Sequence, residues 1–377
     1  MEAKGLYIHI PFCVQKCRYC DFTSYVASGN EIDRYLDSLE KELEMYKLNE
    51  EEISTIFIGG GTPTILSTIQ LDRLFKMIKD RVNLQKLEEY TIEANPGTLS
   101  IEKLKVIKSG GVNRLSIGLQ AVQDKHLLFM GRIHNLKQFE ESFYNARKIG
   151  FDNINIDVIF AFDNQTVADW KETIDYVAEM KAEHISAYSL IIEEGTDFFD
   201  MYEKGELKDV PEEKYLEMYR YTVDKLNNYG FYQYEISNFC NVGYECKHNI
   251  KYWNCEEYFG VGVAASGYIN NERYTNVKTL KAYAEATTAN VFPIEFKEVL
   301  DFKEHFNEKI MLGLRMNSGI NLSLIDKINN QELEKCIIKS IDNYQKKGYI
   351  EKCKDGTIKL TQSGREISNS IIIDLML

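Results

Sequence analysis

Six alternations of a short apolar run and a longer amphipathic stretch most constrain how this 377-residue chain can fold. The apolar runs span residues 6–10, 55–58, 89–94, 113–118, 153–158 and 184–190. Strands that alternate with helices pair in parallel through right-handed crossovers. A doubly wound sheet is the alternative, but no glycine-rich dinucleotide fingerprint follows the first run. The repeat therefore predicts an α/β fold of the partial (β/α)6 TIM-like barrel type, with its chemistry at the carboxyl ends of the strands.

The second half of the chain breaks this repeat. The spacing of apolar residues predicts a helix over 211–229 and a β-rich run over 230–236. A loop rich in Cys, His, Tyr and Trp follows over 240–262. The last part is mostly helical and closes in a hairpin with Asp355 and Gly356 at its turn. Two helices followed by a hairpin indicate a winged-helix-like module.

This change of pattern predicts two domains. The first spans 1–292, with the Cys/His/Tyr/Trp loop in an extension over about 193–292, and the second spans 293–377. From residue 297 on, 13 Lys/Arg stand against 12 Asp/Glu, whereas the whole chain carries a net charge of −13. A DNA-reading wing should be basic, so we expect a packing or cofactor-covering module and no nucleic-acid partner.

The cysteines are interpreted from the compartment that the sequence indicates. The chain has no run of about 18 apolar residues and no leader of the secretory type, so a cytoplasmic location is predicted. The eight cysteines of a cytoplasmic chain stay reduced. They are therefore expected to be metal ligands or core residues before disulfides.

Three of the cysteines form one compact motif. Cys13, Cys17 and Cys20 follow the first predicted strand with the spacing Cys-x3-Cys-x2-Cys. Three thiolates in so short a loop can ligate three irons of a [4Fe-4S] cluster and leave the fourth iron open. Zinc is the alternative, but a closed zinc site needs a fourth ligand, and His9 lies too near along the strand.

The motif and the residues before it, Tyr7 to Phe12, resemble the radical S-adenosylmethionine (SAM) superfamily. Within it, the chain resembles the oxygen-independent coproporphyrinogen III oxidase-like proteins over essentially its whole length. The resemblance implies that the amino and carboxylate groups of SAM bind the open iron. It also implies that an electron from the reduced cluster cleaves SAM to a 5′-deoxyadenosyl radical.

Polar or glycine residues end the successive predicted strands, as a ring around one pocket requires. A glycine triplet closes the second strand and lets backbone approach a ligand. Carboxylates and a guanidinium on later strands can bind amine, hydroxyl and carboxylate groups. By resemblance, the SAM-contact positions are Tyr7, Tyr19, Gly60, Gly61, Thr62, Glu93, Gln120, Arg132 and Asp157.

One turn departs from the family pattern. After Asp157 the family usually shows Gly-x-Pro-x-Gln-Thr, but this chain has Ala161 and Asp163 where the pattern has Gly and Pro. Proline normally stiffens such a turn. We therefore expect a different local geometry there, with the Asp157 assignment unchanged.

Two features separate the branches of this family. Authentic oxidases resemble Cys-x3-Cys-x2-Cys-x-Cys and carry a long N-terminal arm, whereas here Phe22 takes the fourth cysteine's place and six residues precede Tyr7. The chain instead resembles the heme-chaperone branch. Coproporphyrinogen dehydrogenase activity is therefore not expected, although oxidative decarboxylation of propionates to vinyls remains the alternative function. Whether the chain is an enzyme at all is left open.

A second motif supports the chaperone branch. His248, Tyr252 and Trp253 stand as the HNxxYW element of that branch. Histidine is a good axial ligand for heme iron, and flat aromatic faces suit a macrocycle. Cys246 is a further candidate ligand, and a structural loop is the alternative interpretation. A second metal site on Cys240, Cys246 and Cys255 is disfavoured by their loose spacing.

The sequence thus predicts a protein that holds a [4Fe-4S] cluster, SAM and heme. We expect it to pass heme to an acceptor hemoprotein, such as a membrane-associated respiratory enzyme. A cluster exposed at a loop could also order a homodimer. The sequence names neither the electron donor nor the acceptor, and it leaves open whether SAM is cleaved or only regulates.

Overall fold

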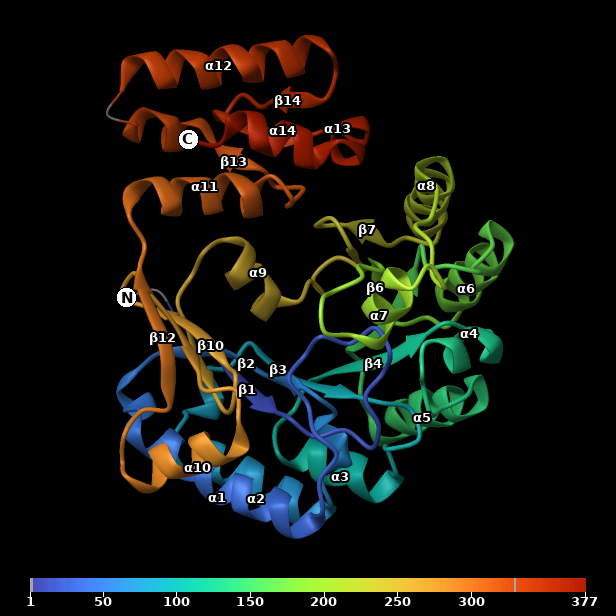
Figure 1. Ribbon diagram of the computed structural model, residues 1–377, viewed down its shortest axis with the longest axis vertical. Helices are drawn as coiled ribbons and strands as arrows, with labels where there is room; N and C mark the ends of the chain where they lie inside the picture. Colours follow the sequence, from blue (N-terminus) through green and yellow to red (C-terminus); the bar gives the residue numbers. More distant parts are fainter. Residues whose placement is uncertain (1–2, 329) are drawn as a thin grey trace.

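The computed structural model describes residues 3–328 and 330–377, and its centre is a large sheet with a layer of helices on one side (Figure 1). Six parallel strands lie in consecutive order in this sheet. They are β1 (Lys4–Ile10), β2 (Ile53–Gly60), β3 (Glu89–Ala94), β4 (Arg114–Gln120), β5 (Ile154–Phe160) and β6 (His184–Ser189). The helices between them are α1 (Gly29–Met45), α2 (Thr68–Lys79), α3 (Ile101–Ser109), α4 (Asp124–Phe129), α5 (Leu136–Ile149) and α6 (Val167–Glu179). All six predicted strands are confirmed.

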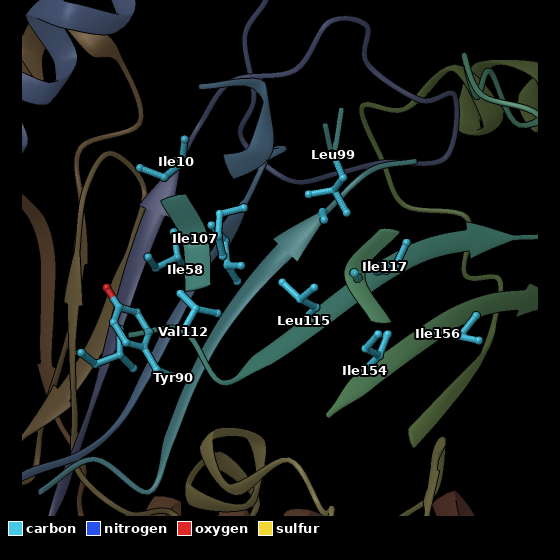
Figure 2. Close-up of a cluster of buried hydrophobic side chains, with 14 of the residues drawn as sticks. Ile10, Ile58, Tyr90, Leu99, Ile107, Val112, Leu115, Ile117, Ile154 and Ile156 are labelled. Atoms are coloured by element: carbon cyan, nitrogen blue, oxygen red, sulfur yellow. The ribbon is translucent and has the colours of Figure 1, made fainter. Parts of the chain in front are cut away.

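Alternation along the strands gives the sheet two different faces. Leu6, Ile8 and Ile10 of β1 are fully buried in the main apolar core. Figure 2 shows this core, where side chains of neighbouring strands meet Ile107 of α3. Successive side chains of a strand point to opposite faces, so the residues between these apolar positions face the interior of the partial barrel. There Asp157 accepts hydrogen bonds from Ser116 and Asn155 at 2.9 and 2.8 Å.

Further strands extend the sheet on both sides of the six. Beyond β6 lie α7 (Asp197–Glu203), α8 (Glu212–Asn228), β7 (Tyr232–Gln233) and β8 (Asn238–Cys240). Next come α9 (Lys247–Trp253), β9 (Tyr258–Val261), β10 (Ser266–Ile269), β11 (Glu272–Asn276), α10 (Leu280–Thr288) and β12 (Ile294–Val299). The strand order is β12-β11-β10-β9-β1-β2-β3-β4-β5-β6-β8-β7, and the described strands do not close into a barrel. The prediction of a partial barrel within an α/β fold is confirmed.

Two predictions for the second half need correction. The stretch 240–262 is not only a loop, because it contains α9 and β9, and β9 pairs in parallel with β1. The chain from residue 293 on does not start as a helix, because β12 pairs antiparallel with β11. Strand β9 pairs with the distant β1, and β12 pairs with β11 across the intervening helix α10, which local spacing does not reveal. The main sheet therefore continues past the domain boundary expected at residue 293.

The C-terminal part forms its own apolar core. Its elements are α11 (Phe302–Gly313), β13 (Ile320–Asn321), α12 (Gln331–Lys346), β14 (Ile350–Lys352), β15 (Thr357–Leu360), α13 (Gln362–Glu366) and α14 (Ser368–Leu375). The three strands pair in the order β13-β15-β14, with Gly356 in the turn of the expected hairpin at a φ of +84°. Ile310, Ile341, Ile358 and Ile371 are buried together between these strands and helices. Within the described ranges, no helix is both long and apolar enough to cross a membrane.

Helix α9 closes the amino-terminal end of the sheet. Its backbone N–H groups at Lys247 and His248 donate to the Glu89 carboxylate at the start of β3, at 2.8 and 3.1 Å. The His248 ring bonds to Thr55 of β2 at 2.8 Å. The Nζ of Lys251 donates to the carbonyl of Ala3 just before β1. The three first strands are thus tied to α9 at the end opposite to the cysteine motif.

Candidate functional site

A cavity of about 450 Å³ lies at the carboxyl ends of β1 to β6. It gathers residues that are more than 170 positions apart in the sequence, because parallel strands end at one edge of the sheet. Eleven predicted site residues line it: Cys13, Cys17, Tyr19, Cys20, Gly60, Gly61, Thr62, Glu93, Gln120, Arg132 and Asp157. The ring that the sequence predicted therefore exists as a geometric feature.

The cysteine motif is held by backbone hydrogen bonds on both sides. The N–H of Cys13 donates to the carbonyl of Tyr25, and the N–H of Arg18 donates to the carbonyl of Met130, each at 3.0 Å. The Arg132 guanidinium donates to the Sγ of Cys17 at 3.6 Å. The loop thus presents its three sulfur atoms from one segment to the same cavity.

The chemistry of this donor set fits an iron–sulfur cluster. Burial raises the pKa of the Cys13 thiol, and burial raises the pKa of the Cys20 thiol to about 11. Both thiols are therefore protonated at neutral pH without metal, and iron would displace the protons as the sulfur atoms become ligands. Across the described residues, no three His, Cys, Asp or Glu side chains stand close enough to hold a single metal ion.

The glycine triplet leaves no room for side chains at three successive positions. A Cβ at Gly59 would lie 2.7 Å from the Glu93 carboxylate, and one at Gly60 would lie 2.4 Å from the His9 ring. A Cβ at Gly61 would lie 2.7 Å from the carbonyl of Phe12. Gly60 also has a φ of +105°, which a residue with a side chain rarely adopts. The triplet therefore lets β2 end against the cysteine segment and the Glu93 carboxylate.

Two buried carboxylates line the cavity. Burial, and next the charge of Asp157, raise the pKa of Glu93 to about 7. Its Oε2 accepts the N–H of Gly60 at 3.1 Å. Burial also raises the pKa of Asp157, which lies in the middle of β5 rather than at its end. A positively charged or hydrogen-bond-donating ligand would stabilise both carboxylates in their charged form.

A guanidinium lines the same cavity. Arg132 donates to the Oδ1 of Asn95 at 2.6 Å and to the carbonyl of Gly118 at 3.0 Å. Nearby Gln120 has a φ of +71°, and its Oε1 is buried without a hydrogen-bond partner. An unpaired buried oxygen is costly unless a ligand donates to it. The cavity therefore holds an unused acceptor beside a fixed cation.

Two residues that the sequence did not predict line the cavity, and one predicted residue is absent from its lining. Tyr7 is not among the lining residues, and its hydroxyl lies 2.9 Å from the His9 Nδ1, so its contact with SAM stays a prediction. Asn95 lines it and bonds both Thr62 and Arg132. Tyr188, next to last in β6, also lines it. Asn95 and Tyr188 both lie near a strand end, so the rule that polar residues at strand ends line the cavity could have found them.

The structure places His248 far from this cavity, at the opposite end of the strands. Its ring is fully buried, and its nitrogens bond to Thr55 at 2.8 Å and to the Tyr252 hydroxyl at 2.7 Å. Burial lowers the pKa of His248 to about 3, so the ring is neutral. In this arrangement neither ring nitrogen is free to bind iron. Cys246 is buried as well, with its Sγ 3.5 Å from Glu89.

Three cysteines on one loop at the carboxyl mouth of six parallel strands define a protein of the radical SAM class. Residues 7–177 match the Radical SAM superfamily model, and residues 300–367 match the HemN C-terminal domain. The chain belongs to the family of the heme chaperone HemW proteins. It is 39% identical to heme chaperone HemW of Bacillus subtilis over 98% of both chains. It is also 39% identical to that of Lactococcus lactis, over 100% of this chain and 98% of the relative.

A solved structure shares the fold over nearly the whole chain. Coproporphyrinogen III oxidase (HemN) from Escherichia coli has a TM-score of 0.85 and 23% identity, over 99% of this chain and 90% of that chain. At this identity the likeness concerns the fold alone. The resemblance drawn from the cysteine motif is confirmed by the family-model matches and the full-length relatives.

The turn that departs from the family pattern is strained in this chain. Ala161 has a φ of +60°, where the pattern has glycine, and the side chain of Gln165 accepts its N–H at 2.9 Å. We expect Ala161→Gly to raise the free energy of unfolding by about 0.5–1 kcal/mol, because glycine adopts this φ without strain. The measurement is the denaturant midpoint.

Ala284→Gly in α10 is the matched control for this exchange. Ala284 lies inside a helix, so the same change should lower stability by about 1 kcal/mol. A loss of stability at both positions would show that the turn at Ala161 carries no strain.

Proposed function

We propose that this chain is a cytoplasmic heme chaperone that carries a [4Fe-4S] cluster and SAM in the cavity at the carboxyl ends of β1 to β6. The observation that carries the proposal is full-length identity of 39% to proteins named heme chaperone HemW. The cavity supports it, because eleven of the residues expected for the cluster and SAM line it together.

Each part of the cavity has a proposed role toward these groups. Cys13, Cys17 and Cys20 would hold the cluster, which when reduced supplies an electron to bound SAM. Arg132 would pair with the SAM carboxylate, since a guanidinium binds a carboxylate through two parallel hydrogen bonds. Glu93 and the glycine triplet would receive the amino group, and Asp157 the ribose. Gln120 would use its unpaired oxygen as an acceptor.

The fourth position of the cysteine motif favours the chaperone over the oxidase. Phe22 stands there, lines the cavity and is 62% exposed, so this side chain offers no sulfur ligand. An exposed phenyl ring at a cavity rim is suited to contact a partner or an apolar ligand. The fold likeness to HemN fits both functions equally and does not decide between them.

The partners of the proposed function follow from its chemistry. Heme is the cargo, and the acceptor is a hemoprotein, for which we retain a membrane-associated respiratory enzyme as the candidate. His248, Tyr252 and Trp253 remain predicted heme residues, and their use would require α9 to move away from β2. A homodimer and a separate electron donor stay predictions from the sequence.

One anaerobic experiment tests this function. The cluster is reconstituted, and the protein is then assayed for heme transfer to an apo-hemoprotein and for protoporphyrinogen formation from coproporphyrinogen III. We expect transfer without decarboxylation. Robust decarboxylation without transfer would overturn the chaperone proposal in favour of the oxidase. In parallel, unchanged heme affinity and spectrum in His248→Ala would remove the histidine ligand.

The affinity for SAM should depend on pH through Glu93. Its pKa of about 7 in the free protein means that the carboxyl is protonated below this pH. The sulfonium and the amine of SAM favour the ionised carboxylate, so binding below pH 7 releases a proton. Affinity should therefore rise by up to about tenfold per pH unit toward pH 7 and then level off.

Equilibrium dialysis of labelled SAM measures this effect. The pH values run from about 5.5 to about 8 and so bracket the pKa of Glu93. The charges of Asp157 and Arg114 also shift the pKa of Glu93. Glu93→Gln is therefore the control, because it removes the titrating carboxyl and keeps the other charged groups. The variant should bind SAM with a flat pH profile over this range. An identical slope in both proteins would assign the titration to another group.

A further inference from the structure

A second cavity, of about 540 Å³, adjoins the first and has no role in the proposed binding of cluster and SAM. Its walls are the turn after β5, the segment after β6, helix α7 and the start of α8. Ser189, Leu190 and Ile191 line both cavities, so this segment is a shared wall. Sites for cofactor-sized ligands have volumes of roughly 300–1,000 Å³, so the second cavity is large enough for one.

The lining of this second cavity suits a flat apolar molecule. Eight apolar residues line it: Ala161, Phe162, Leu190, Ile191, Ile192, Phe199, Leu207 and Val210. Ile191 is 65% exposed in the unfilled cavity. An apolar ligand that covers exposed apolar side chains removes their surface from water, and this lowers the free energy of binding.

One polar pair in the lining has the chemistry of an iron ligand. The Tyr202 hydroxyl donates to the Oδ2 of Asp209 at 2.9 Å, and both residues line the cavity. Tyrosine oxygen is an axial ligand of heme iron in some proteins, and a carboxylate bonded to a ligand orients it and increases its basicity. Tyr202 is 38% exposed, so its oxygen can be reached without moving another element.

The remaining charges around the cavity are compatible with heme. Asp163 is occupied, because its carboxylate accepts the N–H groups of Asn164 and Lys208 at 2.8 and 3.3 Å. The Lys208 side chain is exposed and supplies a cation at the rim, where a propionate can pair with it. Glu212 is exposed and stays in solvent.

We propose that ferric heme binds in this second cavity, with the Tyr202 oxygen as its iron ligand and Asp209 positioning that oxygen. The proposal rests on the proposed heme-chaperone function and names the site of its cargo. As the Fe–O bond forms, the phenol loses its proton, which passes through the Asp209 carboxylate to solvent. The iron stays ferric throughout, so the step needs no electron donor or acceptor.

This site explains heme binding without unfolding any part of the described chain. His248 would have to break two hydrogen bonds and leave a fully buried position before it could reach iron. Tyr202 exchanges one hydrogen bond to an exposed carboxylate for an iron bond. The second cavity also places the cargo beside the cysteine-lined cavity, whereas His248 lies at the other end of the strands.

Hemin titration of the full chain, followed by absorption and resonance Raman spectra, tests the proposal. Tyr202→Phe should lose the phenolate-to-iron charge-transfer band, and Asp209→Asn should weaken ferric heme binding by about 10–100-fold. Iron-free protoporphyrin IX should bind wild type and Tyr202→Phe equally, because it lacks the ligated metal. SAM binding should also be unchanged, which shows that the variant is folded.

Tyr229→Phe is the matched control. Tyr229 is 43% exposed and its hydroxyl bonds a carboxylate, that of Glu179, but it does not line the cavity. This variant should keep the wild-type spectrum. Wild-type spectra and affinity in Tyr202→Phe would overturn this proposal alone. A wild-type chain that takes up no hemin would overturn the proposed function itself.

Discussion

Cys17→Ser should abolish assembly of the iron–sulfur cluster while leaving the chain folded. After anaerobic reconstitution, we expect the iron and sulfide content of the variant to fall to the level of unreconstituted protein. A cluster with an open iron depends on all three sulfur ligands, and a serine oxygen is a poor substitute for a thiolate. The half-buried Cys17 contributes little packing, so stability should be nearly unchanged.

Cys336→Ser is the control for this exchange. Cys336 is exposed on α12 and does not line the cavity, so its loss should leave cluster content unchanged. The measurement is iron and acid-labile sulfide per chain, together with the visible absorption of the cluster. A Cys17→Ser protein that still holds a full cluster would refute the assignment of the three ligands.

Gly60→Ala should both destabilise the chain and eliminate SAM binding. The new Cβ would lie 2.4 Å from the His9 ring, and the φ of +105° is unfavourable for alanine. Backbone strain of this kind costs about 1–3 kcal/mol, and the displacement of His9 adds to it. Relief of the strain would move the N–H of Gly60 away from Glu93, which it now bonds at 3.1 Å.

Gly29→Ala provides the comparison for this variant. Gly29 begins α1, and a Cβ there would meet no atom within 4 Å. Alanine at this position should leave SAM affinity unchanged and stability equal or slightly higher. The readouts are the thermal midpoint and the SAM dissociation constant of reconstituted protein. Normal SAM affinity in Gly60→Ala would mean that the triplet plays no part in the site.

The parallel strands could be predicted because their evidence is local. β3 has the predicted bounds, Glu89–Ala94. The ends of the other five strands differ from the predicted ends by no more than two residues. These strands are apolar runs that alternate with helices, and Ser67 and Thr166 form capping boxes at the starts of α2 and α6. The strands β9 and β12 could not be found in this way, since β9 pairs with the distant β1 and β12 pairs with β11 across the helix α10.

That the site residues meet at one edge follows from topology, whereas their assignment to SAM follows from the family resemblance. Once six strands are parallel, polar residues near their carboxyl ends share one edge, as Glu93 does, and Asp157 reaches the same cavity from the middle of β5. The depth of a residue could not be predicted, and the hydroxyl of Tyr7 lies 2.9 Å from the His9 Nδ1. The burial of His248 could not be predicted either, because the HNxxYW pattern is the same whether its helix is buried or exposed.

The segment Ser189 to Ile191 has a thermodynamic consequence as the partition between two chambers. If filling one chamber displaces this partition, the free energy of filling the other changes by the same amount, whichever ligand enters first. SAM would then alter the retention of heme by the factor by which heme alters the retention of SAM. Cofactor occupancy could in this way govern cargo release without any SAM being consumed.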